Sequence, residues 1–286
     1  MSQIVYVNGD YVAAEDAKVS VFDRGFLMAD AVYEVTSVIG GKLVDFDGHA
    51  TRLQRSMSEL EMVSPVTMED LLEIHRQLVA RNDLDEGGIY LQITRGAPDS
   101  RDFVWPDPDE VKCGIVLFTF EKALVDSKVM DDGIKVISMD DIRWGRRDIK
   151  TTQLLYPSFA KMQAKKAGAA DAWLVEDGFV TEGTANNAYI VKDGTIITRQ
   201  LGNDILHGIT RAAILRFAKE AQMQVEERPF TIEEAQAADE AFVTSATGFA
   251  QPVIDIDGAT IGTGKPGSIS KRLREIYTEE MTKAAI

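Results

Sequence analysis

The chain has 286 residues and a formal net charge of −15 at pH 7, from 31 basic and 46 acidic side chains. This negative charge argues against non-specific binding to nucleic acid or to an anionic membrane surface, because both carry repelling phosphates. The length exceeds one small core, and the hydrophobic content of 45% is ordinary for a folded protein, so we expect two domains that share a cleft.

The cysteine, histidine and apolar patterns narrow the class of protein further. Cys113 is the only cysteine in the sequence, which excludes an intrachain disulfide and suits a reducing cytoplasm. The N-terminal segment has no basic start and no apolar core, so no signal peptide is expected, and no apolar run approaches membrane-spanning length. The three histidines are scattered singly, which predicts no transition-metal site.

The first part of the chain combines strand and helix patterns. Apolar residues alternate on both sides of Asn8-Gly9, which predicts a hairpin. Two helices, the second capped by Thr67 and Asp70, and two strands are predicted next, over residues 49–62, 67–82, 89–94 and 111–120. The last of these strands is nearly all apolar, which predicts burial. The first part is therefore expected to be an α+β domain.

A more polar stretch over residues 121–128 predicts a linker, which divides the chain into domains of residues 1–120 and 129–286. The second domain is expected to be rich in strands. Its predicted elements are a strand, a helix that ends at a glycine, two hairpins with Asp-Gly turns, a helix, a strand and a terminal helix, over residues 133–139, 150–168, 171–183, 188–199, 208–222, 242–248 and 268–281.

The segment DIRWGRRDIKTTQ, residues 141–153, places Lys150 close to three arginines. Positive neighbours and burial both favour the uncharged form of a lysine, which is the nucleophile of Schiff-base chemistry. A solvated basic loop is the alternative interpretation of the same segment.

Several other positions suit a phosphorylated ligand. Gly208 precedes a predicted helix, and the amides of Ile209 and Thr210 with the hydroxyl of Thr210 form a typical anion site, although an ordinary N-cap fits equally. Arg52 suits phosphate through bidentate contacts, and Glu182 lies in a tight polar loop of the kind that often carries function. The residues alone indicate an enzyme or a binding protein for a phosphorylated small ligand.

Six segments in register carry a specific resemblance. They are DRGF…DAVYEV, HATRL, DIRW…DIK, TEGTANN, HGITR and FVTSATG. In order and spacing they resemble the class IV aminotransferases, pyridoxal-phosphate enzymes of fold type IV, and most closely the D-amino-acid aminotransferases. The resemblance covers nearly the whole chain from Ile4. It implies two α/β domains with the cofactor cleft between them, and it makes residues 129–286 the cofactor-binding domain.

The resemblance also assigns cofactor roles. Lys150 matches the lysine that bonds covalently to the cofactor and moves the proton between Cα and C4′, and Glu182 matches the carboxylate that keeps the pyridine nitrogen protonated. The remaining matches concern the phosphate cup, its far side, where Ala246 offers only its backbone N–H, and the wall of the pocket. They are Arg52, Ile209 and Thr210; Ser245 and Ala246; and Arg143.

Substrate recognition departs from the pattern at one position. In D-amino-acid aminotransferases a tyrosine and an Arg-x-His pair from the partner subunit hold the substrate carboxylate. Tyr33 fits the tyrosine and Arg101 fits the arginine, but Phe103 stands where the histidine would be. Arg101 still suits a bidentate carboxylate contact, while Phe103 makes the site more apolar.

We therefore predict a cytoplasmic, homodimeric, pyridoxal-phosphate-dependent aminotransferase that moves an amino group between a D-amino acid and a 2-oxo acid. Its active site would be completed by the partner subunit. The alternatives on the same scaffold are an (R)-selective amine:pyruvate transaminase and a branched-chain L-amino-acid aminotransferase. A non-catalytic phosphate-ligand-binding protein is the alternative from another class.

Overall fold

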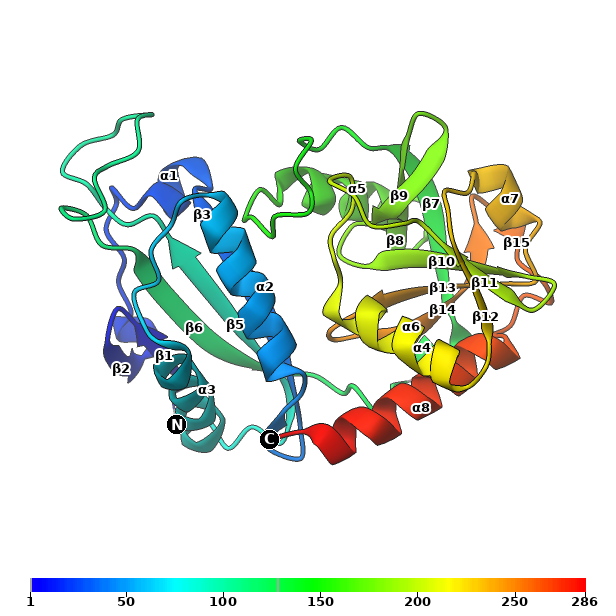
Figure 1. Ribbon diagram of the computed structural model, residues 1–286, viewed down its shortest axis with the longest axis horizontal. Coiled ribbons are helices and arrows are strands. Elements are labelled where there is room, and N and C mark those ends of the chain that lie inside the picture. The colour runs from blue at the N-terminus through cyan, green and yellow to red at the C-terminus, as the bar shows by residue number, and fades with distance from the viewer. Residues whose placement is uncertain (1, 128) are drawn as a thin grey trace. The chain divides into compact units, whose positions relative to one another are not determined.

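A computed structural model describes residues 2–127 and 129–286 (Figure 1). Lys128, the last residue of the predicted linker, lies outside the described residues. Contacts divide the chain into two units. The first comprises Met1–Ala123, Ile149–Gln153 and Ala284–Ile286, and the second comprises Leu124–Asp148 and Leu154–Lys283. The short segment that contains Lys150 therefore belongs to the first unit.

The first unit contains a six-stranded antiparallel sheet in the order β2-β1-β6-β5-β3-β4. Its strands are β1 (Ile4–Val7), β2 (Asp10–Ala13), β3 (Ala31–Ile39), β4 (Lys42–Leu43), β5 (Glu86–Thr94) and β6 (Gly114–Glu121). The hairpin predicted at Asn8-Gly9 is confirmed. Both residues have positive φ, 50° and 112°, as the turn between two twisted strands requires.

Two long helices build the core of the first unit on this sheet. The helical elements are η1 (Ala14–Asp16), α1 (Arg24–Met28), α2 (Phe46–Glu59) and α3 (Met68–Arg81). Leu53 of α2 and Leu78 of α3 are fully buried and share one cluster with Leu91 and Leu117 of the sheet. The predicted cap of α3 is confirmed, because the Thr67 hydroxyl accepts the amide of Asp70 at 3.1 Å.

The expectation that residues 111–120 form a fully buried strand is wrong. Strand β6 begins at Gly114, and its burial alternates along the chain. Leu117 points into the helical core, whereas Phe118 is 37% exposed on the other face. An antiparallel strand needs one apolar face only, and the apolar residues on the second face do not bury it.

The second unit contains a nine-stranded mixed sheet in which β7 runs parallel to both of its neighbours, β14 and β8. Its strands are β7 (Ile134–Asp140), β8 (Asp171–Glu176), β9 (Phe179–Gly183), β10 (Asn187–Lys192), β11 (Thr195–Thr198), β12 (Gln224–Glu227), β13 (Glu240–Ser245), β14 (Phe249–Ile256) and β15 (Ala259–Thr260). The two hairpins predicted at Asp-Gly turns, β8-β9 and β10-β11, are confirmed.

The helices of the second unit are α4 (Val129–Asp132), α5 (Leu155–Lys166), α6 (Ile209–Glu220), α7 (Ile232–Gln236) and α8 (Ser268–Ala284). The helix predicted from Lys150 is wrong at its start, since α5 begins five residues later. Pro157 explains the late start, because its ring would clash with the carbonyl of Gln153 in a longer helix. The segment that contains Lys150 is thereby left to pair with a strand.

Neither a membrane helix nor a metal cluster occurs in the described part of the chain. Across residues 2–127 and 129–286, every helix is too short or too polar to cross a bilayer. In the same residues, His, Cys, Asp and Glu side chains form no group of three that is suited to a metal ion.

Candidate functional site

Lys150 is fixed in the first unit by pairing with β3. The amide of Tyr33 donates to the carbonyl of Lys150 at 3.0 Å, and the amide of Thr152 donates to the carbonyl of Ala31 at 3.1 Å. From the side of α2, the Ser56 hydroxyl accepts the Lys150 amide at 3.3 Å. The Lys150 amine lies 4.2 Å from the centre of the Tyr33 ring. The structure therefore brings these two predicted site residues together.

Tyr33 begins a row of aromatic rings across three strands. Its ring stacks on Tyr90 with 5.6 Å between centres, and Tyr90 stacks on Phe118 with 4.9 Å between centres. Burial raises the pKa of Tyr90 to about 12, so its hydroxyl stays protonated and donates to Gln92 at 2.8 Å. The row holds the Tyr33 ring in a fixed plane beside the lysine.

Arg52 occupies a buried ion-pair site that the sequence analysis did not predict. Its Nε and Nη2 each donate to Glu34 of β3 at 2.7 Å, one to each carboxylate oxygen. His49 Nδ1 lies 2.7 Å from the same carboxylate. Although burial opposes it, the contact with Arg52 lowers the pKa of Glu34 to about 2. The pair fixes the orientation of the guanidinium at the first unit's predicted phosphate position.

The signal for Glu34 was present in the sequence. Along β3 the residues Val32, Glu34 and Thr36 are all buried, while Tyr33 and Val35 are only partly buried. A carboxylate at a buried position of a strand needs a cation, and the segment HATR supplies one on the helix that packs above. Strand parity would therefore have identified this pair.

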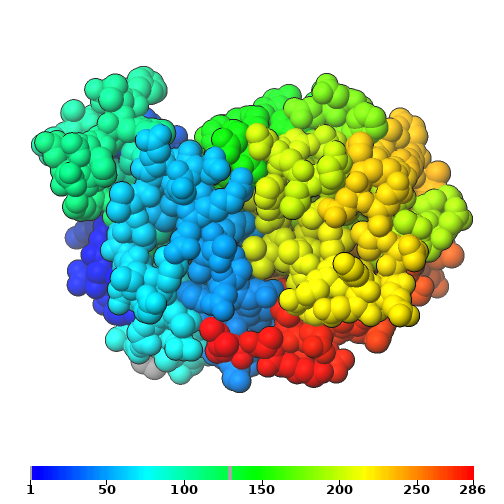
Figure 2. All heavy atoms as spheres, in the orientation of Figure 1, coloured from blue at the N-terminus to red at the C-terminus, as the bar shows by residue number. Residues whose placement is uncertain are grey.

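Arg101 and Phe103 lie in the connection between β5 and β6, which extends away from the sheet in Figure 1 and stands out from the first unit in Figure 2. Phe103 is 75% exposed, and the Arg101 guanidinium lies 4.8 Å from its ring centre. The guanidinium of Arg24 anchors the backbone of this connection by donating to the carbonyls of Asp102 and Val104. The two side chains are therefore presented outward from a fixed backbone.

Glu182 is the buried carboxylate of the second unit, at 4% exposure on β9. One of its oxygens accepts Arg143 Nη1 at 2.8 Å, and the other accepts Asn187 Nδ2 at 3.1 Å and the Leu206 amide at 3.0 Å. Burial raises the pKa of Glu182 even though Arg143 opposes the shift. The site thus suits a further positive partner, such as a protonated ring nitrogen.

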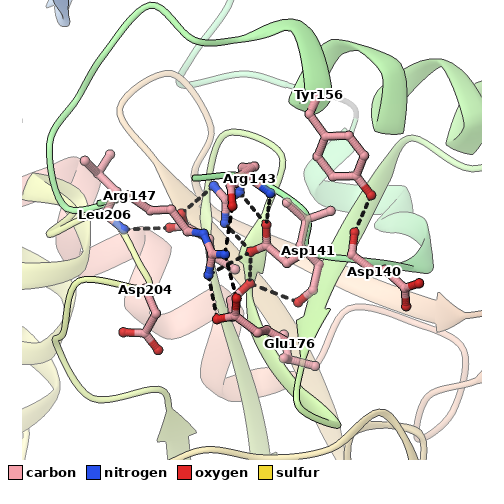
Figure 3. Close-up of polar contacts among 12 residues, drawn as sticks. Asp140, Asp141, Arg143, Arg147, Tyr156, Glu176, Asp204 and Leu206 are labelled. Atoms are coloured by element: carbon pink, nitrogen blue, oxygen red, sulfur yellow. Dashed lines mark hydrogen bonds and ion pairs between the residues drawn. The ribbon is translucent and has the colours of Figure 1, made fainter. Parts of the chain in front are cut away.

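Arg143, predicted to line the cofactor pocket, is engaged with two carboxylates (Figure 3). Its Nε and Nη2 donate to Asp141 at 2.9 and 2.7 Å, and its Nη1 donates to Glu182. The sequence analysis did not identify Asp141, although the spacing Asp141-x-Arg143 follows directly after β7.

The helix start predicted to bind phosphate is present at α6. The helix begins at Ile209 after Gly208, which as N-cap offers no side chain to the first amides. A Cβ at Gly208 would lie 2.1 Å from Asn187 Oδ1, so only glycine fits. The amides of Ile209 and Thr210 find no acceptor in the helix itself, which suits an anion.

The Ser245–Ala246 loop lies near these groups within the second unit. Strand β13 ends at Ser245, and the preceding residue, Thr244, pairs with Asn187 of β10. Because Asn187 also donates to Glu182 and contacts the α6 start, the unit gathers all of its predicted residues around one end of β10 and β13.

The predicted residues thus fall into two groups, each internally connected. The first unit holds Lys150, Tyr33 and Arg52, with Arg101 and Phe103 on its projecting connection. The second unit holds those that match the ring and phosphate contacts, namely Arg143, Glu182, Ile209, Thr210, Ser245 and Ala246.

Known proteins resemble this chain along nearly its whole length. The model of the family described as "Amino-transferase class IV" matches residues 31–256. The D-alanine aminotransferase of Listeria monocytogenes strain 10403S is 37% identical over 280 residues, 98% of this chain and 96% of that protein. The D-alanine aminotransferase of Staphylococcus epidermidis strain ATCC 12228 is 38% identical over 284 residues, 99% of each chain.

A solved structure has the same fold. The branched-chain amino acid aminotransferase of the organism abbreviated T.th., with pyridoxamine 5'-phosphate, superposes with a TM-score of 0.90. It is 28% identical to this chain, and the match covers 99% of this chain and 95% of that one.

Proposed function

The chain belongs to the class IV aminotransferases and is a pyridoxal-phosphate-dependent transaminase of fold type IV, and we propose that it moves an amino group between a D-amino acid and a 2-oxo acid. The observation that carries the substrate class is the identity of 37–38% with two D-alanine aminotransferases over 98–99% of the chain. Arg101, a carboxylate-binding side chain on an exposed connection, supports the same substrate class.

Lys150 and Glu182 carry the central roles in this proposal. The cofactor supplies the electron sink for the pair released at the substrate Cα. Lys150 bonds covalently to the cofactor and, once displaced by the substrate amine, moves the proton between Cα and C4′. Its backbone pairing with β3 restricts the amine to one place beside Tyr33. Glu182 holds the proton on the ring nitrogen, and its buried, incompletely compensated charge suits that partner.

The phosphate is held, in this proposal, by charge and by backbone amides. Arg52 contributes a guanidinium oriented by Glu34, and the α6 start contributes the amides of Ile209 and Thr210 with the Thr210 hydroxyl. The Ser245–Ala246 loop closes the far side. Because Gly208 removes all side-chain bulk, the anion can approach the helix end closely.

We also propose that the protein is a cytoplasmic homodimer whose partner subunit completes the substrate site with Arg101 and Phe103. Exposed apolar side chains support association with a second copy. On α5 they recur at helical spacing, with Leu155 87% and Phe159 50% exposed. Sedimentation at micromolar concentration should give a dimer. A monomer that is fully active would contradict this arrangement.

The domain assignment remains part of the proposal. Residues 1–120 form the N-terminal domain, residues 129–286 form the cofactor-binding domain, and residues 121–128 link them. The change of unit between Ala123 and Leu124 supports the position of the linker. Limited proteolysis should first cut within the linker, and a first cut elsewhere would move the boundary.

A donor panel with pyruvate as acceptor tests the proposed reaction. D-Glutamate should react, with D-alanine formed, and L-leucine and (R)-1-phenylethylamine should react slowly. Two observations favour specific rivals. The T.th. branched-chain enzyme shares the fold closely, and Phe103 adds apolar surface that an aromatic amine would use. Preference for L-leucine or for the amine would replace the D-amino-acid proposal by the corresponding rival.

A further inference from the structure

Five charged side chains of alternating sign run through the second unit from Glu182 to Glu176 (Figure 3). Arg143 Nη1 lies 2.8 Å from Glu182, and Arg143 Nη2 lies 2.7 Å from Asp141. Arg147 Nη1 lies 3.5 Å from the same oxygen of Asp141, and both Nη atoms of Arg147 lie 2.8 Å from Glu176. The five groups thus form one continuous ionic chain.

The chain leads from the buried carboxylate toward solvent. The Asp141 side chain is fully buried and that of Glu182 is 5% exposed, whereas that of Glu176 is 38% exposed. The members come from three places, namely β8, β9 and the segment after β7. A buried ion pair that is well hydrogen-bonded holds its members in one geometry, so the chain ties Glu182 to the body of the unit.

Arg143 is the member whose orientation matters most. Its Nε and Nη2 form a fork with both oxygens of Asp141, and its backbone amide donates to the same carboxylate at 3.2 Å. The Thr181 hydroxyl fixes Asp141 from the other side at 2.7 Å. Since a guanidinium is planar, this fork fixes the direction of the third nitrogen, Nη1, which is the one that meets Glu182.

We propose that Arg143 is a positioning residue that acts through Glu182: held in its fork by Asp141, it fixes the orientation of the Glu182 carboxylate and keeps it negatively charged. This inference rests on the proposed role of Glu182 toward the ring nitrogen. It gives Arg143 a function other than direct contact with the cofactor, because its Nε, Nη1 and Nη2 are directed at protein carboxylates.

The groups around Glu182 give the direction of the effect. Arg143 stabilises the carboxylate by charge, and the Leu206 amide and the Asn187 amide group stabilise it by hydrogen bonds. Burial and the negative charge of Asp141 oppose them. Removing the guanidinium leaves the opposing effects in place, so the carboxyl would take up a proton at higher pH.

The test compares two variants of neighbouring arginines in the full-length protein, with and without cofactor. Arg143→Met removes the fork, and Arg146→Met is the matched control. Arg146 lies in the same segment but pairs with Asp148 at 3.0 Å. Infrared spectra recorded against pH, assigned with Glu182→Gln, follow the protonated carboxyl band of Glu182 in each variant.

We expect the midpoint of that band to rise by about 1–3 pH units in Arg143→Met and to stay at the wild-type value in Arg146→Met. The visible spectrum of the bound cofactor should become pH-dependent over the same range in Arg143→Met only. Arg143→Lys should restore the midpoint in part, because it keeps the charge without the fork. Equal midpoints in the two methionine variants would overturn the inference.

Two further results keep the outcomes separate. If Arg143→Met does not fold, Arg143→Gln removes the charge but keeps hydrogen bonds to both carboxylates, and the same rise is expected. If Glu182→Gln transaminates at the wild-type rate, the proposed function of Glu182 fails. The infrared midpoint still decides whether Arg143 controls the charge of that carboxylate.

Discussion

Lys150 and Tyr33 are joined twice, through the backbone hydrogen bond from the Tyr33 amide to the Lys150 carbonyl at 3.0 Å and through the amine, which lies 4.2 Å from the ring centre. A strand partner fixes the backbone of the lysine, and the stacked ring of Tyr33 fixes one side of its amine. A flexible side chain on a rigid backbone suits a group that must first bind the cofactor and then transfer protons around it.

The first prediction concerns Lys150 itself. Lys150→Ala should leave the protein folded but unable to bond covalently to the cofactor, because the side chain is only partly buried and belongs to no core cluster. Borohydride reduction followed by peptide mapping should label Lys150 in the wild type and nothing in the variant. Labelling of a different lysine would remove Lys150 from its proposed role.

The second prediction concerns the buried partner of Arg52. Glu34→Gln should lower the free energy of unfolding by about 3–5 kcal/mol, because it leaves a buried guanidinium without its counter-charge. It should also weaken cofactor retention, since Arg52 loses the bidentate contact that orients it. Urea unfolding and dialysis measure the two effects. As control, Glu275→Gln on α8 removes a carboxylate that is 67% exposed and should change neither.

The third prediction follows from the same pair at acid pH. The pKa of Glu34 is lowered from 4.5 to about 2, so its stabilising contribution is complete above about pH 5 and is lost as the pH falls toward 2. The loss should be on the order of 3 kcal/mol. Urea unfolding between pH 2 and 7 should therefore show a shallower acid slope for Glu34→Gln than for wild type. Parallel curves would contradict the assignment.

The fourth prediction tests the helix start. Gly208→Ala would place a Cβ 2.1 Å from Asn187 Oδ1, so we expect a loss of about 1–3 kcal/mol in unfolding free energy together with weaker cofactor retention. Gly145→Ala is the control, because a Cβ there meets no atom within 4 Å. Equal cofactor affinity in both variants would separate the α6 start from the phosphate.

Local signals in the sequence predicted much of the fold. The turns at Asn8-Gly9, Asp177-Gly178 and Asp193-Gly194 need residues that tolerate positive φ, and all three hairpins are present. The pairing of Lys150 with β3 was missed because it joins residues more than a hundred positions apart, and no local pattern encodes such a contact.

The candidate site shows the same division. Gly208 with the helix after it was predictable, because the helix and its cap are local. The ionic partners Glu34 of Arg52 and Asp141 of Arg143 were not identified. The former required the parity of β3 together with the place of α2, and the latter required knowing that Arg143 turns back toward its own segment.

The last prediction separates the proposed substrate class from its rivals. Arg101 is a cation on the exposed connection, and its guanidinium lies 4.8 Å from the Phe103 ring. Arg101→Ala should lose most of the activity toward D-alanine, by at least about tenfold, because a charge-assisted contact contributes about 1.5–3 kcal/mol. It should change little toward (R)-1-phenylethylamine, which has no carboxylate to bind.

Phe103→His should act in the opposite direction from Arg101→Ala. A histidine adds a hydrogen-bond donor beside Arg101, so kcat/KM for D-alanine should rise while that for the aromatic amine falls with the loss of apolar surface. Steady-state rates of both variants with both donors, pyruvate serving as acceptor for the amine and 2-oxoglutarate for D-alanine, measure the difference. If the wild type prefers the amine and neither substitution changes the rate with D-alanine, Arg101 does not bind the substrate carboxylate, and the amine transaminase becomes the better assignment.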